Sequence, residues 1–153
     1  RALAAARRDP AAAISHQRAG RRATMTTVAL DPALVERVLD RLGFARPPAP
    51  DRAGLAALYR AWCEHVPFDN LRKRLHVASG DPGPLPGDAP PEFFDAWLRL
   101  GSGGTCWAGN GALCELLVAL GFRAVRGVAT MLVAPDLPPN HGTVVVTIDG
   151  DQF

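Results

Sequence analysis

Residues 101–122 read GSGGTCWAGNGALCELLVALGF, and this segment constrains the fold more than any other. Its first five residues form a flexible glycine-rich turn, so a helix is expected to begin near Cys106. The leucines that follow recur at the spacing of one helical face, and Gly121 is placed to end the helix; they are Leu113, Leu116, Leu117 and Leu120. Helical patterns precede this stretch and strand-like sequence follows it, which predicts an α+β arrangement.

Three apolar patterns upstream predict further helices. The first begins at Asp31-Pro32, a capping residue followed by one suited to the first turn, and its apolar side is Leu34, Val35, Val38, Leu39 and Leu42. The second is expected from Asp51 to about Glu64, with an apolar face made of Leu55, Leu58, Tyr59 and Trp62. The third follows a loop at 78–91, and its apolar side is Phe93, Phe94, Trp97 and Leu98.

Downstream of residue 121 the sequence becomes rich in valine and threonine. Residues 122–134 and 143–148 are expected to be strands. Asp149-Gly150 is a two-residue hairpin signal, so residues 151–153 are expected to start a returning strand.

The bulk composition is that of a globular protein with one ordinary core. Of its 153 residues, 48% are hydrophobic and 21% are charged, which fits neither a disordered nor a membrane-embedded chain. No apolar run approaches the length that crosses a bilayer. The three cysteines are an odd number without a secretory signal, which predicts reduced thiols and a cytoplasmic location.

The positive charge is concentrated at the start of the chain. Residues 1–24 hold six arginines and one acid, whereas the remainder holds 11 basic and 14 acidic residues. A mildly acidic folded part gives no support to nucleic-acid binding. Residues 1–24 are interpreted as a disordered leader that lies upstream of the natural start at Met25.

Cys106 has the strongest case for reactivity. A cysteine at a helix N-terminus faces unpaired backbone N–H groups and the positive end of the helix dipole, and both favour the nucleophilic thiolate. The same N–H groups can stabilise an oxyanion, and the preceding glycines let a substrate approach the backbone closely. By spacing alone, a lone cysteine before an amphipathic helix is more often structural.

The other thiols and His141 have weaker cases. Cys63 and Cys114 lie within helical patterns and are interpreted as buried thiols. Cys63 with His65 lacks a second ligand pair at zinc-like spacing, so no metal site is predicted. His141 precedes a predicted strand, where its ring can face a cleft and serve a cysteine as base. Alone, it would be interpreted as a solvent-exposed loop residue.

Three segments together resemble the arylamine N-acetyltransferase family. Residues 67–71 (PFDNL) are similar to the family's Pro-Phe-Glu-Asn-Leu segment. Residues 103–107 (GGTCW), with Asn110 and the LGF at 120–122, resemble its Arg-Gly-Gly-x-Cys-aromatic-Glu-x-Asn motif and the Leu-Gly-Phe that closes the helix. His141 occupies the place of the family's catalytic histidine.

The resemblance covers about the first half of the family and implies both a fold and a reaction. The fold would be a helical bundle at 25–121 followed by the first strands of an antiparallel β-barrel domain at 122–153, an incomplete cysteine-protease-like acetyltransferase fold. Acetyl-CoA would be the acyl donor and a small arylamine or hydrazine the acceptor, with no metal and no nucleic-acid or membrane partner.

The resemblance also implies roles for six residues. Cys106 would carry the acetyl group in a ping-pong cycle and His141 would be its base. Phe68 would form an apolar wall for an aromatic acceptor, and the remaining predicted substrate contacts are Gly104, Thr105 and Trp107.

Two departures from the family pattern leave alternatives open. The family's third triad residue is an aspartate on the strand after the hairpin, and residues 1–153 stop before it, so they are expected to be inactive by themselves and poorly soluble. Ser102 stands where the family has an arginine that pairs with the acid at 69, and Ala108 stands where Glu or Gln is usual. The alternatives are an amide synthase that closes a macrolactam from a carrier-bound acyl thioester, and a degenerate, non-catalytic relative.

Overall fold

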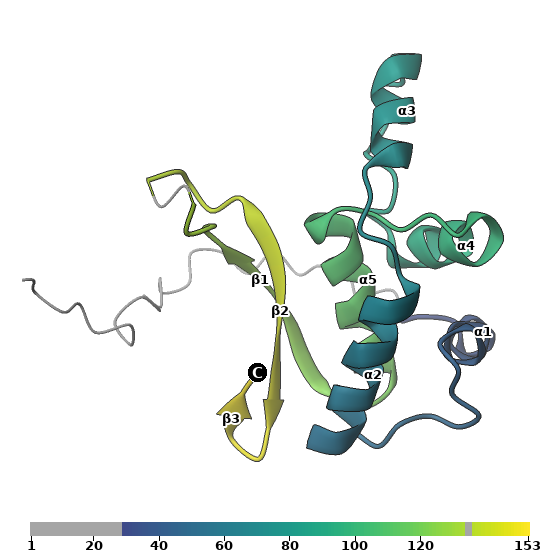
Figure 1. Cartoon of the computed structure of the whole chain (residues 1–153), viewed down its shortest axis with the longest axis vertical. Coiled ribbons are helices and arrows are strands. Elements are labelled where there is room, and N and C mark those ends of the chain that lie inside the picture. Colours follow the sequence, from purple (N-terminus) through teal and green to yellow (C-terminus); the bar gives the residue numbers. More distant parts are fainter. Residues whose placement is uncertain (1–28, 134–135) are drawn as a thin grey trace, which may run out of the picture.

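The computed structural model describes residues 29–133 and 136–153. The predicted leader at 1–24 and the start at Met25 lie outside the described residues. Within them, five helices precede a three-stranded antiparallel sheet of order β1-β2-β3, so the α+β prediction is confirmed. The wider β-barrel stays a prediction. Figure 1 shows α5 in the middle of the molecule, in contact with β1 and β2 on one side and with α4 on the other.

The first two helices begin close to where the sequence predicts, and each follows an aspartate cap, of which only Asp31 was predicted as one. Helix α1 spans Pro32–Arg41, and the Asp31 carboxylate accepts a hydrogen bond from the N–H of Ala33 at 3.2 Å. Helix α2 spans Arg52–His65, and the Asp51 carboxylate accepts from the N–H of Gly54 at 2.8 Å. Each carboxylate satisfies a backbone donor that the first helical turn leaves free.

Two helices flank the predicted loop and shorten it at both ends. Helix α3, which the sequence did not predict, spans Leu71–Ser79 and contains no buried residue. It projects from the rest of the molecule (Figure 1). Helix α4 spans Pro90–Leu100 and buries Phe93, Phe94 and Trp97, as predicted.

Helix α5 spans Cys106–Ala119 and is the centre of the core. Its predicted apolar positions Leu113, Leu116 and Leu117 are all buried, and Gly121 follows it at a φ of 88°, the left-handed geometry that glycine adopts without strain. Beside it, the Trp62 and Phe93 rings stack with centroids 6.0 Å apart, an arrangement that anchors α2 to α4.

The sheet follows the helices. Strand β1 spans Arg123–Ala129, β2 spans His141–Ile148 and β3 spans Asp151–Gln152. The predicted first strand was therefore too long, and β2 begins two residues earlier than predicted. Asp149 and Gly150 both have positive φ, 53° and 90°, which confirms the predicted two-residue hairpin.

Two buried positions predicted on α2 are wrong. The Tyr59 side chain is 58% exposed, and Cys63 is exposed as well. The neighbours Leu58 and Trp62 are buried, so α2 contacts the core through a narrower stripe than the sequence pattern indicated.

Among the described residues, no helix combines the length and the apolar character needed to cross a bilayer.

Candidate active site

Five of the six predicted site residues line one cavity of about 210 Å³. The exception is Trp107. The cavity lies where α2, the turn before α5 and the start of β2 meet, and its walls are Trp62, Val66, Pro67, Phe68, Gly104, Thr105, Cys106, Gly109, Asn110 and His141. The structure thus brings Cys106 and His141 into one cavity, although 34 residues separate them in the chain.

Cys106 is the first residue of α5. Thr105 caps the helix with an extended backbone, φ −79° and ψ 177°, and its side chain makes no capping hydrogen bond. The first helical bond runs from the N–H of Gly109 to the Thr105 carbonyl at 2.9 Å. Within the described part of the chain, no acceptor therefore meets the N–H groups of the first turn beside the Cys106 thiol.

His141 is held close to Cys106 by its neighbour Gly142. A Cβ atom added to Gly142 would lie 3.2 Å from the Cys106 carbonyl oxygen and 3.1 Å from the Trp107 ring, so the backbone of β2 rests directly on the first turn of α5. Asn110 Nδ2 donates to the Gly142 carbonyl at 2.6 Å. The sequence analysis did not predict this contact. The only sign of it in the sequence was the glycine directly after His141, which allows a close backbone approach.

The wall that contains Phe68 is paired with the turn before Cys106. Phe68 and Gly104 form a parallel β-bridge, and the N–H of Asp69 donates to the Gly104 carbonyl at 3.2 Å. Phe68 remains 77% exposed while it lines the cavity, so one face of the ring is open to an incoming group.

Trp107 lies on the outer side of the same helical turn. The Arg126 guanidinium stands 4.8 Å from the centroid of the Trp107 ring, and Arg126 Nη2 donates to the Trp107 carbonyl at 3.2 Å. This stack holds the indole beside β1, away from the cavity that contains Cys106.

The three cysteines differ in environment. Cys114 is buried, and this burial raises the pKa of its thiol, with a smaller contribution from Glu115. Cys106 is partly exposed and Cys63 is exposed on α2. In the described ranges, no three His, Cys, Asp or Glu side chains gather in a way that would hold a metal ion.

Ser102 and Ala108 differ in how well the structure accounts for them. Ala108 is a core residue, 8% exposed, and its Cβ lies 3.0 Å from the position that a Cβ on Gly104 would take. A larger side chain has no room there as the segments stand. The Ser102 hydroxyl oxygen is buried and has no hydrogen-bond partner among the described residues.

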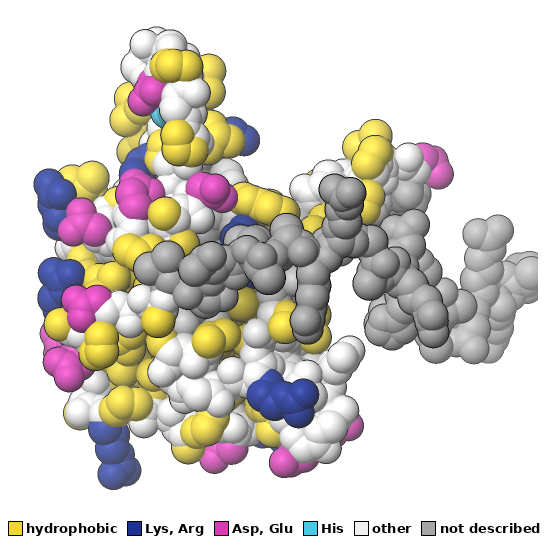
Figure 2. Space-filling view, turned by 180° about the vertical axis from the view of Figure 1, so that it is seen from behind, with side chains coloured by type: hydrophobic (Ala, Val, Ile, Leu, Met, Phe, Trp, Pro, Cys, Tyr) yellow, Lys and Arg dark blue, Asp and Glu magenta, His cyan; other side chains and the backbone are white. Residues whose placement is uncertain are grey.

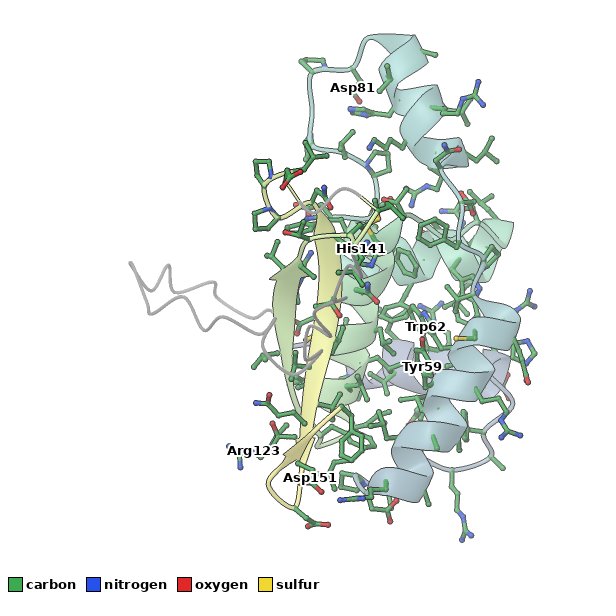
Figure 3. The ribbon with its side chains drawn as sticks, turned by 60° about the vertical axis from the view of Figure 1, so that its left-hand side comes forward. Tyr59, Trp62, Asp81, Arg123, His141 and Asp151 are labelled. Atoms are coloured by element: carbon green, nitrogen blue, oxygen red, sulfur yellow. The ribbon has the colours of Figure 1, made fainter. Side chains whose placement is uncertain are left out.

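A second, larger cavity of about 580 Å³ lies between α2, α5 and β2 and shares Asn110 and His141 with the first. No thiol lines it, so the smaller cavity is the candidate active site. Figure 3 shows His141 near one end of β2 and Asp151 at the other end of the sheet. In the described residues, no carboxylate is hydrogen-bonded to the His141 ring.

Comparisons with known proteins agree on one enzyme class, the acyltransferases. No protein-family profile matches the chain. A curated arylamine N-acetyltransferase of Mycolicibacterium smegmatis is 31% identical over 117 residues, which cover 73% of this chain and 40% of that relative.

Solved structures give the same name. An arylamine N-acetyltransferase structure from M. smegmatis superposes with a TM-score of 0.62 at 29% identity, over 80% of this chain and 43% of that one. One from M. tuberculosis has a TM-score of 0.62 at 28% identity, over 80% and 44%. The resemblance to the arylamine N-acetyltransferases is therefore confirmed. The chain spans about 40% of the length of the curated relative.

Proposed function

We propose that the protein transfers an acetyl group from acetyl-CoA to an arylamine or hydrazine through a thioester on Cys106. The observation that carries this proposal is the cavity that joins a thiol at a helix N-terminus, an imidazole and an exposed aromatic wall. An activated nucleophile with an adjacent base is the arrangement that ping-pong acyl transfer requires.

In the first half-reaction, His141 takes the proton of the Cys106 thiol, and the thiolate attacks the acetyl carbonyl of acetyl-CoA. The carbonyl oxygen becomes an oxyanion, which the N–H groups of the first turn of α5 would stabilise. Collapse of this intermediate breaks the bond to the CoA sulfur. The CoA thiolate leaves with the proton from His141, and Cys106 keeps the acetyl group.

In the second half-reaction, the amine nitrogen attacks the acetyl carbonyl on Cys106. His141 accepts a proton from the nitrogen and returns it to the cysteine sulfur as the thioester bond breaks. The products are the acetylated amine and the free thiol. Phe68 would pack against the aromatic ring of the acceptor and hold its amine over the thioester.

An acid that orients His141 is the part of the mechanism that residues 29–133 and 136–153 do not supply. Asp149 and Asp151 belong to the hairpin that follows β2, and Figure 3 shows Asp151 at the end of the sheet away from His141. Loss of the orienting acid lowers kcat about 10⁴-fold in a Ser-His-Asp triad. We therefore expect these 153 residues alone to show no measurable turnover, and activity is to be sought in the complete gene product.

The test is a donor-by-acceptor assay of the complete gene product. Acetyl-CoA with a panel of arylamines and hydrazines should give N-acetyl products, and Cys106→Ser should give none. Acylation by a carrier-linked thioester with indifference to acetyl-CoA would replace this proposal with the amide-synthase alternative. Turnover with neither donor in a folded protein would identify a non-catalytic relative.

A further inference from the structure

Two walls of the cavity come from separate segments, and one carboxylate joins them. Asp69 Oδ2 accepts a hydrogen bond from the N–H of Gly103 at 2.8 Å, across 34 residues of chain. Asp69 Oδ1 accepts from the N–H of Leu71 at 3.0 Å. The Gly103 bond and the bond from the Asp69 N–H to the Gly104 carbonyl fasten the Phe68 segment to the turn that leads into Cys106, whereas the Leu71 bond lies within the Phe68 segment.

The Asp69 carboxylate has no cationic partner among the described residues. Arg72 lies closest to it in sequence, but its guanidinium is paired with Glu92. Position 102 holds a serine whose hydroxyl makes no bond. The negative charge is therefore met by backbone N–H groups, and hydrogen bonds of this charge-assisted kind are shorter and stronger than neutral ones.

The two segments touch through their backbones. A Cβ atom added to Gly103 would lie 1.8 Å from the Pro67 carbonyl oxygen, so no side chain fits between them. Phe68 follows directly and lines the cavity with Cys106. The bonds of Asp69 therefore fix how far the aromatic wall stands from the thiol.

We propose that Asp69 is a positioning residue that holds the Phe68 wall against the turn before Cys106 and so limits the size of the group that reaches the thiol. The inference deepens the proposed function and rests on it, because a narrow cavity selects a small acyl group such as acetyl. Loosening the wall admits bulkier reagents to Cys106.

The experiment compares a small and a bulky thiol reagent on the full chain, resolved by site with peptide mass spectrometry. Iodoacetamide and N-(1-pyrenyl)maleimide are reacted with the wild type, Asp69→Asn and Asp69→Glu. Cys63, exposed on α2, is the internal reference. Asp81→Asn is the matched control, because Asp81 also accepts from a glycine N–H at 2.8 Å but lies on the projecting arm with α3 (Figure 3).

In Asp69→Asn, the maleimide-to-iodoacetamide rate ratio at Cys106 is expected to rise about tenfold relative to Cys63. Asparagine replaces one acceptor oxygen with an amide nitrogen, which cannot accept a hydrogen bond. The loss of one such bond shifts the balance between the held and the loosened Phe68 wall by about that factor. Asp69→Glu keeps both acceptor oxygens and should restore the wild-type ratio, and Asp81→Asn should not change it. An unchanged ratio at Cys106 in folded Asp69→Asn would overturn the proposal.

If Asp69→Asn does not fold, hydrogen exchange in the wild-type protein tests the positioning role of Asp69 instead. The Gly103 N–H is bonded to Asp69 Oδ2 and to no other acceptor among the described residues. Its hydrogen exchange should be at least about tenfold slower than in an unstructured peptide. Exchange at the unstructured rate would refute the positioning role of Asp69. Neither readout uses acetyl-CoA. If Asp69 holds the Phe68 wall but the protein transfers no acetyl group, only the proposed function is refuted.

Discussion

At the level of single residues, the proposed chemistry depends on His141 at the start of β2. We predict that His141→Gln lowers the rate at which acetyl-CoA acylates Cys106 by about 10²- to 10⁴-fold, the usual contribution of a general base. The fold should persist, because His141 is only partly buried and its ring makes no hydrogen bond within the described ranges. Single-turnover mass spectrometry measures the rate, and an unchanged rate would remove His141 from the mechanism.

The Ser102 hydroxyl is expected to contribute nothing to the stability of the fold. This buried hydroxyl has no partner in the described structure, so Ser102→Ala should leave the free energy of unfolding unchanged or raise it by up to about 1 kcal/mol. Ser79→Ala is the matched control, since the Ser79 hydroxyl donates to the His76 carbonyl at 2.8 Å. Urea unfolding monitored by circular dichroism measures both. A loss above about 1 kcal/mol in Ser102→Ala would show that the hydroxyl is bonded after all.

At the level of elements, α3 and α4 should differ sharply in their contribution to stability. Phe93 of α4 is 0% exposed, so Phe93→Ala is expected to cost about 3–5 kcal/mol of unfolding free energy. Leu75 of α3 is 62% exposed, so Leu75→Ala should stay within about 0.5 kcal/mol of wild type. Equilibrium urea unfolding tests both substitutions. A large cost for Leu75→Ala would mean that α3 packs against something in solution.

The same contrast explains which elements could be predicted from sequence. Helices α1, α2, α4 and α5 bury an apolar stripe, and such a stripe leaves a periodic pattern. Helix α3 buries none of its residues, so its sequence carried no pattern to find. Strand β2 starts early at His141 because it pairs with Ala129, a tertiary cause that local propensity does not contain.

Only part of the candidate site could be predicted from the sequence. Cys106 and His141 were proposed from a helix terminus and a family resemblance, and the structure places both in one cavity. The contacts that hold the cavity together were not foreseen. Asn110 to Gly142 and Asp69 to Gly103 join segments 32 and 34 residues apart, and only the packed fold brings them together.

At the level of the whole molecule, the described surface leaves apolar side chains and strand backbone open. Val125, Val128 and Leu132 are 62%, 57% and 89% exposed, and Figure 2 shows hydrophobic side chains spread over the visible face. Val146 exchanges both backbone bonds with Phe153. Val144, two residues earlier, presents its backbone groups to the same edge of β2, where no described residue pairs with them.

We therefore predict that the 153-residue chain self-associates at micromolar concentration, because unpaired strand edges and exposed apolar surface both favour aggregation. Size-exclusion chromatography with light scattering measures the association. Val125→Lys should reduce it, since a lysine on the outer strand opposes sheet stacking. A monomer that melts cooperatively over the same concentrations would contradict the prediction.

Whether Cys106 carries the acetyl group is measured by the intact mass of the complete gene product after incubation with acetyl-CoA. We expect one acetyl increment that maps to Cys106 and is absent from Cys106→Ala, while Cys63→Ala keeps it. A folded protein that gains no increment, or that keeps it in Cys106→Ala, would show that Cys106 is not the acetyl carrier.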